Sequence, residues 1–147
     1  MSIVVKYQVA IGAVFIWIGF IGAISFMEAW LKFRAPGVTL PLGLGIGRLV
    51  FGMLHKVELI ISIVIIISII YAGLNSSILI YLPFLFAFSI VLIQGFWLLP
   101  VLDTRADMLI QGQEVPPSNL HFVFVGAEVI KTVCLLFFGI NLLKVPK

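Results

Sequence analysis

The sequence predicts an all-α integral membrane protein, folded as an up-down bundle of four transmembrane helices. Of its 147 residues, 63% are hydrophobic and only 10% are charged, and the mean hydropathy is +1.28. A soluble globular domain carries about 25% charged residues. No charged side chain occurs within residues 7–27 or within residues 59–102. Because a bilayer core takes about 20 apolar residues per helical crossing, the first stretch holds one span and the second holds most of two.

Four spans account for the apolar sequence, at residues 7–31, 49–72, 78–101 and 120–143. The first is longer than the apolar core of a signal peptide, and no A-x-A-type cleavage site follows it, so we expect it to be retained. Between the first two spans, the Pro- and Gly-rich stretch 35–47 predicts an apolar loop at the membrane interface. By length, residues 1–147 form a single membrane domain.

The third and fourth spans carry their own end signals. The third helix should bend or stop near Pro100, since proline lacks the amide donor that a helix interior needs. Ser118 or Asn119 is expected to cap the fourth helix. That helix contains Glu128 and Lys131 but is otherwise largely apolar.

Composition also excludes some classes of protein. The single cysteine, Cys134, cannot form an intramolecular disulfide, and the chain has no C-x-x-C pattern. The nine basic residues are spread along the chain without clusters, so we expect no nucleic-acid partner. The partners that the sequence favours are the lipid bilayer and, through exposed Ile and Phe faces, a second copy of the chain or a larger membrane complex.

The ionisable residues are distributed unequally between the two halves of the predicted bundle. Four spans place both termini on one side, together with Lys6, Lys144 and Lys147. All six acidic residues and both histidines lie toward the opposite side. Counting Lys and Arg near the span ends gives nearly equal numbers on the two sides, with a slight excess on the acidic side. Because Lys and Arg are more frequent on the cytoplasmic side of a membrane, this excess slightly favours a cytoplasmic position for the acidic half. We expect a plasma or inner membrane location.

Polar residues recur along one face of three spans, because residues three, four and seven apart share a helix face. Ionisable groups inside membranes almost always face the bundle interior or a wet cavity, so we expect these faces to point toward one another. The faces comprise Trp17, Ile21, Ser25, Glu28 and Lys32 on the first span, Arg48, Gly52, His55, Glu58 and Ser62 on the second, and His121, Glu128 and Thr132, with Lys131 nearby, on the fourth.

These faces predict an intramembrane carboxylate and histidine site near one membrane face, which binds a metal ion or a small polar or anionic ligand. Candidate ligand-binding residues are Glu28, Arg48, His55, Glu58, Gln94, Asp103, Arg105, His121, Glu128 and Lys131. Proton-coupled binding belongs to the same prediction, since acids and bases inside membranes mark proton pathways.

A metal would be a divalent ion, and the protein would then be a metal-assisted membrane enzyme. Carboxylates on several helices with histidines on two of them have the composition of a di-metal carboxylate bundle. The candidate metal ligands are Glu58, His55, Glu128 and Glu28, of which His55 and Glu58 are close enough in sequence to reach one ion. No E-x-x-H motif occurs, so the match is one of composition. A haem held by His55 and His121 is a further alternative.

A structural hypothesis of a different class stands beside these. In it, the chain is a structural or accessory subunit of a membrane complex, and its buried charges only fix helix packing. Glu128 and Lys131 are three residues apart and can pair within their own helix. Glu58 could pair with Arg48, Arg105 or Lys131.

The two halves of the chain are distantly alike. The segment VELIIS at residues 57–62 aligns with AEVIKT at residues 127–132. Such a two-plus-two repeat would place Glu58 opposite Glu128 across a pseudo-twofold axis.

Overall fold

The computed structural model describes residues 6–74 and 77–145, and every regular element in these residues is helical. The elements are α1 (Gln8–Ile21), the π-helical turn η1 (Gly22–Glu28), α2 (Ala29–Leu31), the 3₁₀ turn η2 (Lys32–Arg34), α3 (Leu40–Ala72), α4 (Ile78–Ile93), the π-helical turn η3 (Gln94–Leu98), α5 (Leu99–Ile110) and α6 (Leu120–Leu143). The all-helical prediction is confirmed.

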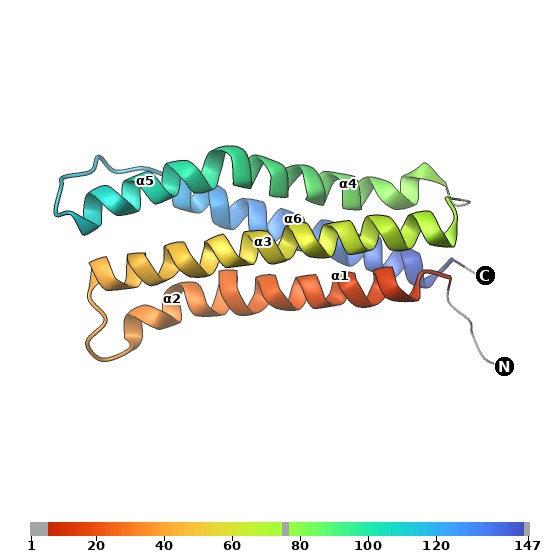
Figure 1. Ribbon diagram of the computed structural model, residues 1–147, viewed down its shortest axis with the longest axis horizontal. Helices are drawn as coiled ribbons and strands as arrows, with labels where there is room; N and C mark the ends of the chain where they lie inside the picture. Colours follow the sequence, from red (N-terminus) through yellow and green to blue (C-terminus); the bar gives the residue numbers. More distant parts are fainter. Residues whose placement is uncertain (1–5, 75–76, 146–147) are drawn as a thin grey trace.

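These elements join into four long helices, each long and apolar enough to cross a membrane: Gln8–Arg34, Leu40–Ala72, Ile78–Ile110 and Leu120–Leu143. They lie lengthwise beside one another, and the chain ends marked N and C are at the same end of the molecule (Figure 1). α1 packs against α3 and α6, α4 packs against α6, and α3 packs against α5. Each long helix therefore has two neighbours around a common interior.

The second helix begins much earlier than the predicted span. Residues 35–47 were expected to form a loop, but α3 starts at Leu40, and the expectation is wrong for the residues after Thr39. Thr39 caps the helix, since its side chain accepts a hydrogen bond from the Leu42 amide at 3.4 Å. Pro41 lies in the first turn, where a missing amide hydrogen leaves no helical bond unmade. Tertiary packing then stabilises the glycine-rich turns: Gly43 and Gly47 are buried.

The third long helix also continues past the point where it was expected to stop. α5 runs through Pro100 to Ile110, so Pro100 does not end the helix. Proline removes an amide donor and crowds the carbonyl one turn earlier. The wider π-helical turn η3 ends directly before α5, so Pro100 lies in the first turn of α5, where both effects are tolerated.

The interior is apolar over the half of the bundle that lies toward the chain ends. Its buried residues are Tyr7, Ala10, Ala13, Val14, Trp17, Ile21, Ile65, Ile69, Tyr81, Phe84, Ala87, Val91, Leu135, Phe138 and Leu142. They come from α1, α3, α4 and α6 and from Tyr7, just before α1, so all four long helices share this core. Phe84 and Phe138 lie with their ring centroids 5.2 Å apart.

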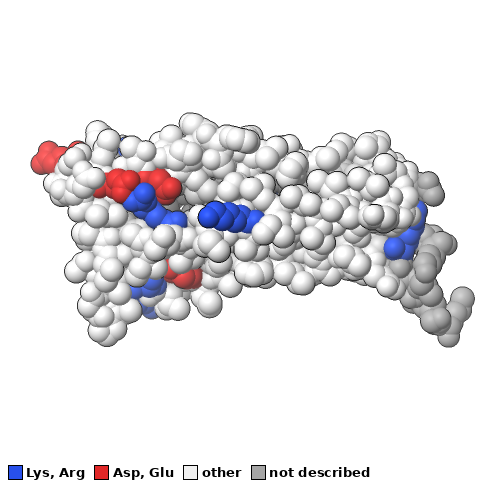
Figure 2. Space-filling view, viewed as in Figure 1, with Lys and Arg blue, Asp and Glu red and all other residues white. Residues whose placement is uncertain are grey.

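The outer surface is apolar as well, which is unusual for a folded chain. Large side chains point outward along the length of every long helix, among them Ile16, Ile60, Phe86, Phe96 and Phe137, each more than half exposed. Figure 2 shows charged side chains gathered toward one end of the visible face and lysine or arginine at the other end, with a wide uncharged band between them. Apolar surface of this extent marks an interaction site, and its distribution around all four helices is compatible with lipid contact.

The packing of the early turns of α3 leads to a matched pair of variants. A Cβ atom at Gly43 would overlap the ring of Phe33, whereas one at Gly45 would meet nothing within 4 Å. Gly43→Ala is therefore expected to lower the free energy of unfolding by about 1–3 kcal/mol through overpacking. Gly45→Ala should raise it by about 0.5–1 kcal/mol, because alanine loses less backbone entropy in a helix. Thermal unfolding in detergent, followed by circular dichroism, measures both. A loss at Gly43 that persists in a Phe33→Ala background would contradict the assignment.

Candidate functional site

Six side chains from all four long helices meet in the interior and form what we call the polar layer. Its ionisable and amide members are Glu58, Gln94, Glu128 and Lys131, none of them more than 2% exposed. Trp17 and Ser25 complete it from the first long helix. The convergence expected from the helix faces is thus present in the structure for Trp17, Ser25, Glu58, Glu128 and Lys131. Gln94 joins them from the third long helix.

The Lys131 ammonium is the centre of the polar layer. Its Nζ atom lies 2.5 Å from Oε1 of Glu58, 2.7 Å from Oε1 of Glu128 and 2.8 Å from Oε1 of Gln94. An ammonium group has three hydrogens to donate, so each one has an acceptor. Since Glu58 and Gln94 belong to different long helices, one side chain of α6 connects three of the four.

The two carboxylates differ in the donors around them. Glu128 receives hydrogen bonds on both oxygens: Oε1 from Gln94 Nε2 at 2.7 Å and from Lys131, and Oε2 from Ser25 Oγ at 2.9 Å. Glu58 receives its bonds from Trp17 Nε1, at 2.9 Å, and from Lys131, and both reach the same oxygen, Oε1.

Local backbone structure places the neutral members of the layer. Ser25 lies within the π-helical turn η1, and Gln94 begins the π-helical turn η3. A π-helical turn inserts one extra residue per turn and changes the direction of the side chains that follow; such turns are frequent at functional sites. Here both turns bring a hydrogen-bond donor to Glu128.

Apolar side chains separate the polar layer from the charged end of the bundle. Leu54, Leu98 and Phe124 are each four residues from a polar-layer residue, one turn closer to that end, and each is at most 6% exposed. One helical turn advances about 5.4 Å along the axis. With the main apolar core on the other side, the polar layer is enclosed by apolar side chains in both directions.

Beyond this apolar turn lies a cavity of about 150 Å³, the end cavity. Its lining residues are Ala29, Lys32, Phe33, Gly43, Leu44, Gly47, Arg48, Phe51, Leu99, Leu102, Asp103, Ala106, His121 and Phe124. All four long helices contribute, and the lining is mainly apolar with a few polar groups. This composition is typical of small-molecule sites.

The two cations of the end cavity have donors left over. The Lys32 side chain is only 9% exposed, and its Nζ atom lies 3.2 Å from Oε2 of Glu28, its one ion-pair partner among the described residues. Arg48 pairs with Asp107 through one terminal nitrogen, and its Nε lies 3.7 Å from Oδ1 of Asp103. That Nε atom is buried and makes no hydrogen bond to the described residues.

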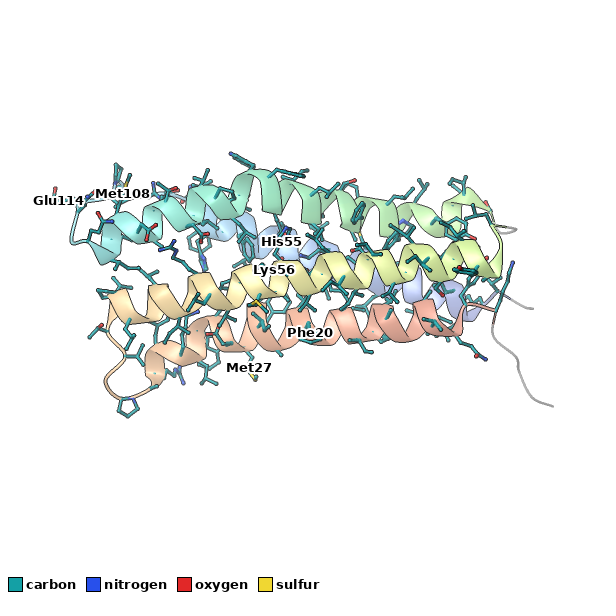
Figure 3. The ribbon with its side chains drawn as sticks, in the orientation of Figure 1. Phe20, Met27, His55, Lys56, Met108 and Glu114 are labelled. Atoms are coloured by element: carbon teal, nitrogen blue, oxygen red, sulfur yellow. The ribbon has the colours of Figure 1, made fainter. Side chains whose placement is uncertain are left out.

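Eight of the ten predicted site residues therefore belong to the polar layer or lie at the end cavity, and two, Arg105 and His55, belong to neither. Glu58, Gln94, Glu128 and Lys131 form the polar layer; Arg48, Asp103 and His121 line the end cavity, and Glu28 pairs with Lys32 beside it. Arg105 instead donates to the Pro116 carbonyl. His55 packs against Gly95, where a Cβ atom would overlap its ring, and its Nδ1 atom is buried without a hydrogen-bond partner in the described chain. Figure 3 labels His55 on α3.

The geometry gives no support to the metal and haem hypotheses. Within residues 6–74 and 77–145, no group of three or more His, Cys, Asp and Glu side chains could hold a metal ion. The Lys131 ammonium takes the position between Glu58 and Glu128 that a cation would need. His121 lines the end cavity and His55 does not, so the two imidazoles do not face one site.

Sequence reasoning gave no binding role to four residues that belong to these sites. Trp17, Ser25 and Lys32 fall on the predicted polar face of the first span, but the spacing did not reveal which partners they would have. Asp107, a partner of Arg48, lies four residues after Asp103 and so on the same helix face. That spacing is a signal from which the pairing could have been predicted.

No protein-family model matches the chain, and no curated protein or solved structure matches it either. The class of protein therefore follows from the fold and the interior alone. It is a small all-helical protein with four helices long enough to span a membrane and an ion-paired polar layer between them.

The charge balance of the polar layer predicts non-additive effects. Glu58→Gln or Glu128→Gln alone leaves one carboxylate beside Lys131, so each should lower the free energy of unfolding by only about 1 kcal/mol. The double variant leaves the ammonium without a counter-charge, and a loss of about 3–5 kcal/mol is expected. Detergent-solubilised protein unfolded by heat or by SDS measures all three. Losses that simply add would show that Lys131 does not depend on the two carboxylates.

Proposed function

We propose that the chain is a four-span integral membrane protein, inserted as an up-down bundle, that binds a small polar or anionic ligand in the end cavity. Insertion is supported by the apolar surface around all four long helices and by the concentration of charge toward the two ends. The end cavity then opens toward one aqueous side, and the count of Lys and Arg near the span ends slightly favours the cytoplasm for that side.

The observation that carries this proposal is a pair of incompletely paired cations in the end cavity. Lys32 is almost fully buried and has a single carboxylate partner among the described residues, beside cation–π contacts with the Phe33 and Phe51 rings. The buried Nε atom of Arg48 makes no hydrogen bond to the described residues. Buried donors without acceptors are costly and uncommon in folded proteins. A ligand oxygen between these two cations would satisfy both.

Size and lining restrict the ligand. The end cavity has a volume of about 150 Å³, similar to that of an apolar cavity known to hold benzene, a molecule of about six non-hydrogen atoms. Phe33, Phe51 and Phe124 line the space beside the cations. Glu28, Asp103 and Asp107 already balance the positive charge of Lys32 and Arg48. The favoured ligand therefore has one carboxylate or similar oxygen group on a short apolar body, rather than several negative charges.

A second candidate function is favoured by a different observation. In the polar layer the Lys131 ammonium, the Gln94 amide, the Trp17 indole and the Ser25 hydroxyl each donate to an acceptor within the layer. A closed network of this kind suits a structural or accessory subunit, in which buried charges fix the helix register. In that case the apolar faces would be covered by a partner subunit or a second copy.

Calorimetric titration of the detergent-solubilised protein with butyrate tests the ligand proposal. Lys32→Met is expected to weaken butyrate binding at least tenfold, because it removes a charge-assisted hydrogen bond worth about 1.5–3 kcal/mol. Lys56→Met is the matched control, since Lys56 is exposed on α3 and is not part of the cavity lining. Inorganic phosphate and butanol, as probes of charge alone and of the apolar body alone, should bind more weakly than butyrate. Equal binding by wild type and Lys32→Met would exclude the proposed site.

A further inference from the structure

The charges of the polar layer do not sum to zero. With Glu58, Glu128 and Lys131 all ionised, two carboxylates face one ammonium, which leaves a formal charge of −1. The remaining members, Trp17, Ser25 and Gln94, are neutral donors and acceptors. An uncompensated charge among apolar side chains is very costly, and Glu58, Glu128 and Lys131 are at most 2% exposed, so bulk water contributes little to compensating it.

We propose that the polar layer binds one proton, and that Glu58 carries it on Oε2. One proton brings the formal charge of the layer to zero. The donor geometry decides between the two carboxylates. Both oxygens of Glu128 accept hydrogen bonds, from Gln94, Lys131 and Ser25, as an ionised carboxylate requires. Both donors to Glu58 reach Oε1, and no donor among the described residues reaches Oε2.

A metal or sodium ion would balance the charge less well than a proton. The Lys131 ammonium already lies between the carboxylates, and its three acceptors include the Oε1 atoms of both glutamates and of Gln94. A further cation would have Oε2 of Glu58 as its one free oxygen in the layer. A single oxygen does not form a cation site, because oxygen-ligated cations take about six ligands.

His55 is the other titratable group near the layer, and it could carry the balancing charge instead. It lies on α3 three residues before Glu58, toward the charged end. Its Nδ1 atom is buried and has no hydrogen-bond partner in the described part of the chain. An imidazolium ion needs acceptors for two N–H groups, so charging His55 would bury an unpaired donor. The neutral imidazole avoids this, and the proton is placed on Glu58.

Infrared spectroscopy of the full chain in lipid vesicles at neutral pH tests the proposal, since a buried protonated carboxyl group has its own C=O stretching band. The band is expected in the wild type. Glu58→Gln should remove it, and so should Glu128→Gln, because one remaining carboxylate is neutralised by Lys131. Glu114→Gln, in the exposed loop after α5, should leave it unchanged. A wild type without the band, or a band that persists in Glu58→Gln, would overturn the proposal.

A second pair of variants locates the proton without changing any charge. Trp17 donates to Glu58 and Ser25 donates to Glu128. If the acid is Glu58, Trp17→Phe removes a hydrogen bond from its C=O oxygen and raises the frequency of the band, while Ser25→Ala leaves the frequency unchanged. The reverse pattern would place the proton on Glu128 and contradict the assignment. A band that sodium ions abolish at constant pH would contradict the choice of a proton over a metal cation.

Discussion

The hydrogen bonds of one ammonium group constrain the whole bundle. Lys131 reaches Glu58, Glu128 and Gln94 at distances between 2.5 and 2.8 Å. A buried charge is tolerated only while its partners are in place, and separating them costs several kcal/mol. Since those partners lie on the second, third and fourth long helices, sliding or rotating one of these three would break a bond at Lys131, and moving the first would break the bonds of Trp17 and Ser25 to the two glutamates. Apolar contacts between Ile, Leu and Phe side chains tolerate such movement far better, so the polar layer selects one register among many.

The same constraint accounts for the less regular parts of the backbone. Both π-helical turns lie where a long helix passes the polar layer, and each supplies a donor to Glu128. The two halves also correspond in detail: Ser62 bonds the Glu58 carbonyl at 2.7 Å, and Thr132 bonds the Glu128 carbonyl at 2.8 Å. These features add to the likeness between VELIIS and AEVIKT and are what a two-plus-two repeat would produce. The departures from it, Ile61 against Lys131 above all, make the two glutamates unequal.

The amino-acid sequence predicted the four long helices through its uncharged apolar stretches, and the meeting of Glu58, Glu128 and Lys131 through residue spacing, because a charge among apolar residues has few stable positions other than the interior. It could not place Ser25 and Gln94 against Glu128, since a π-helical turn has no sequence signature comparable to a helix cap. It predicted a loop for residues 35–47 because glycine and proline are weak helix formers, but packing of Gly43 against Phe33 and Gly47 against Lys32 outweighs that propensity. His55 was placed with the carboxylates from spacing alone, although the missing side chain at Gly95 determines where its ring lies.

The π-helical turn η1 holds Ser25 of the polar layer, which donates to Glu128, and Glu28, the partner of Lys32 in the end cavity, and this relates the two proposals. A ligand that draws the Lys32 ammonium away from Glu28 acts on the turn that holds Ser25. Loss of the Ser25 bond would leave Glu128 with fewer donors and make it a better competitor of Glu58 for the proton. By linkage, a proton that moves between the carboxylates would change ligand affinity by the same factor. Such a coupling would be local, because a single turn of helix holds both Ser25 and the partner of Lys32.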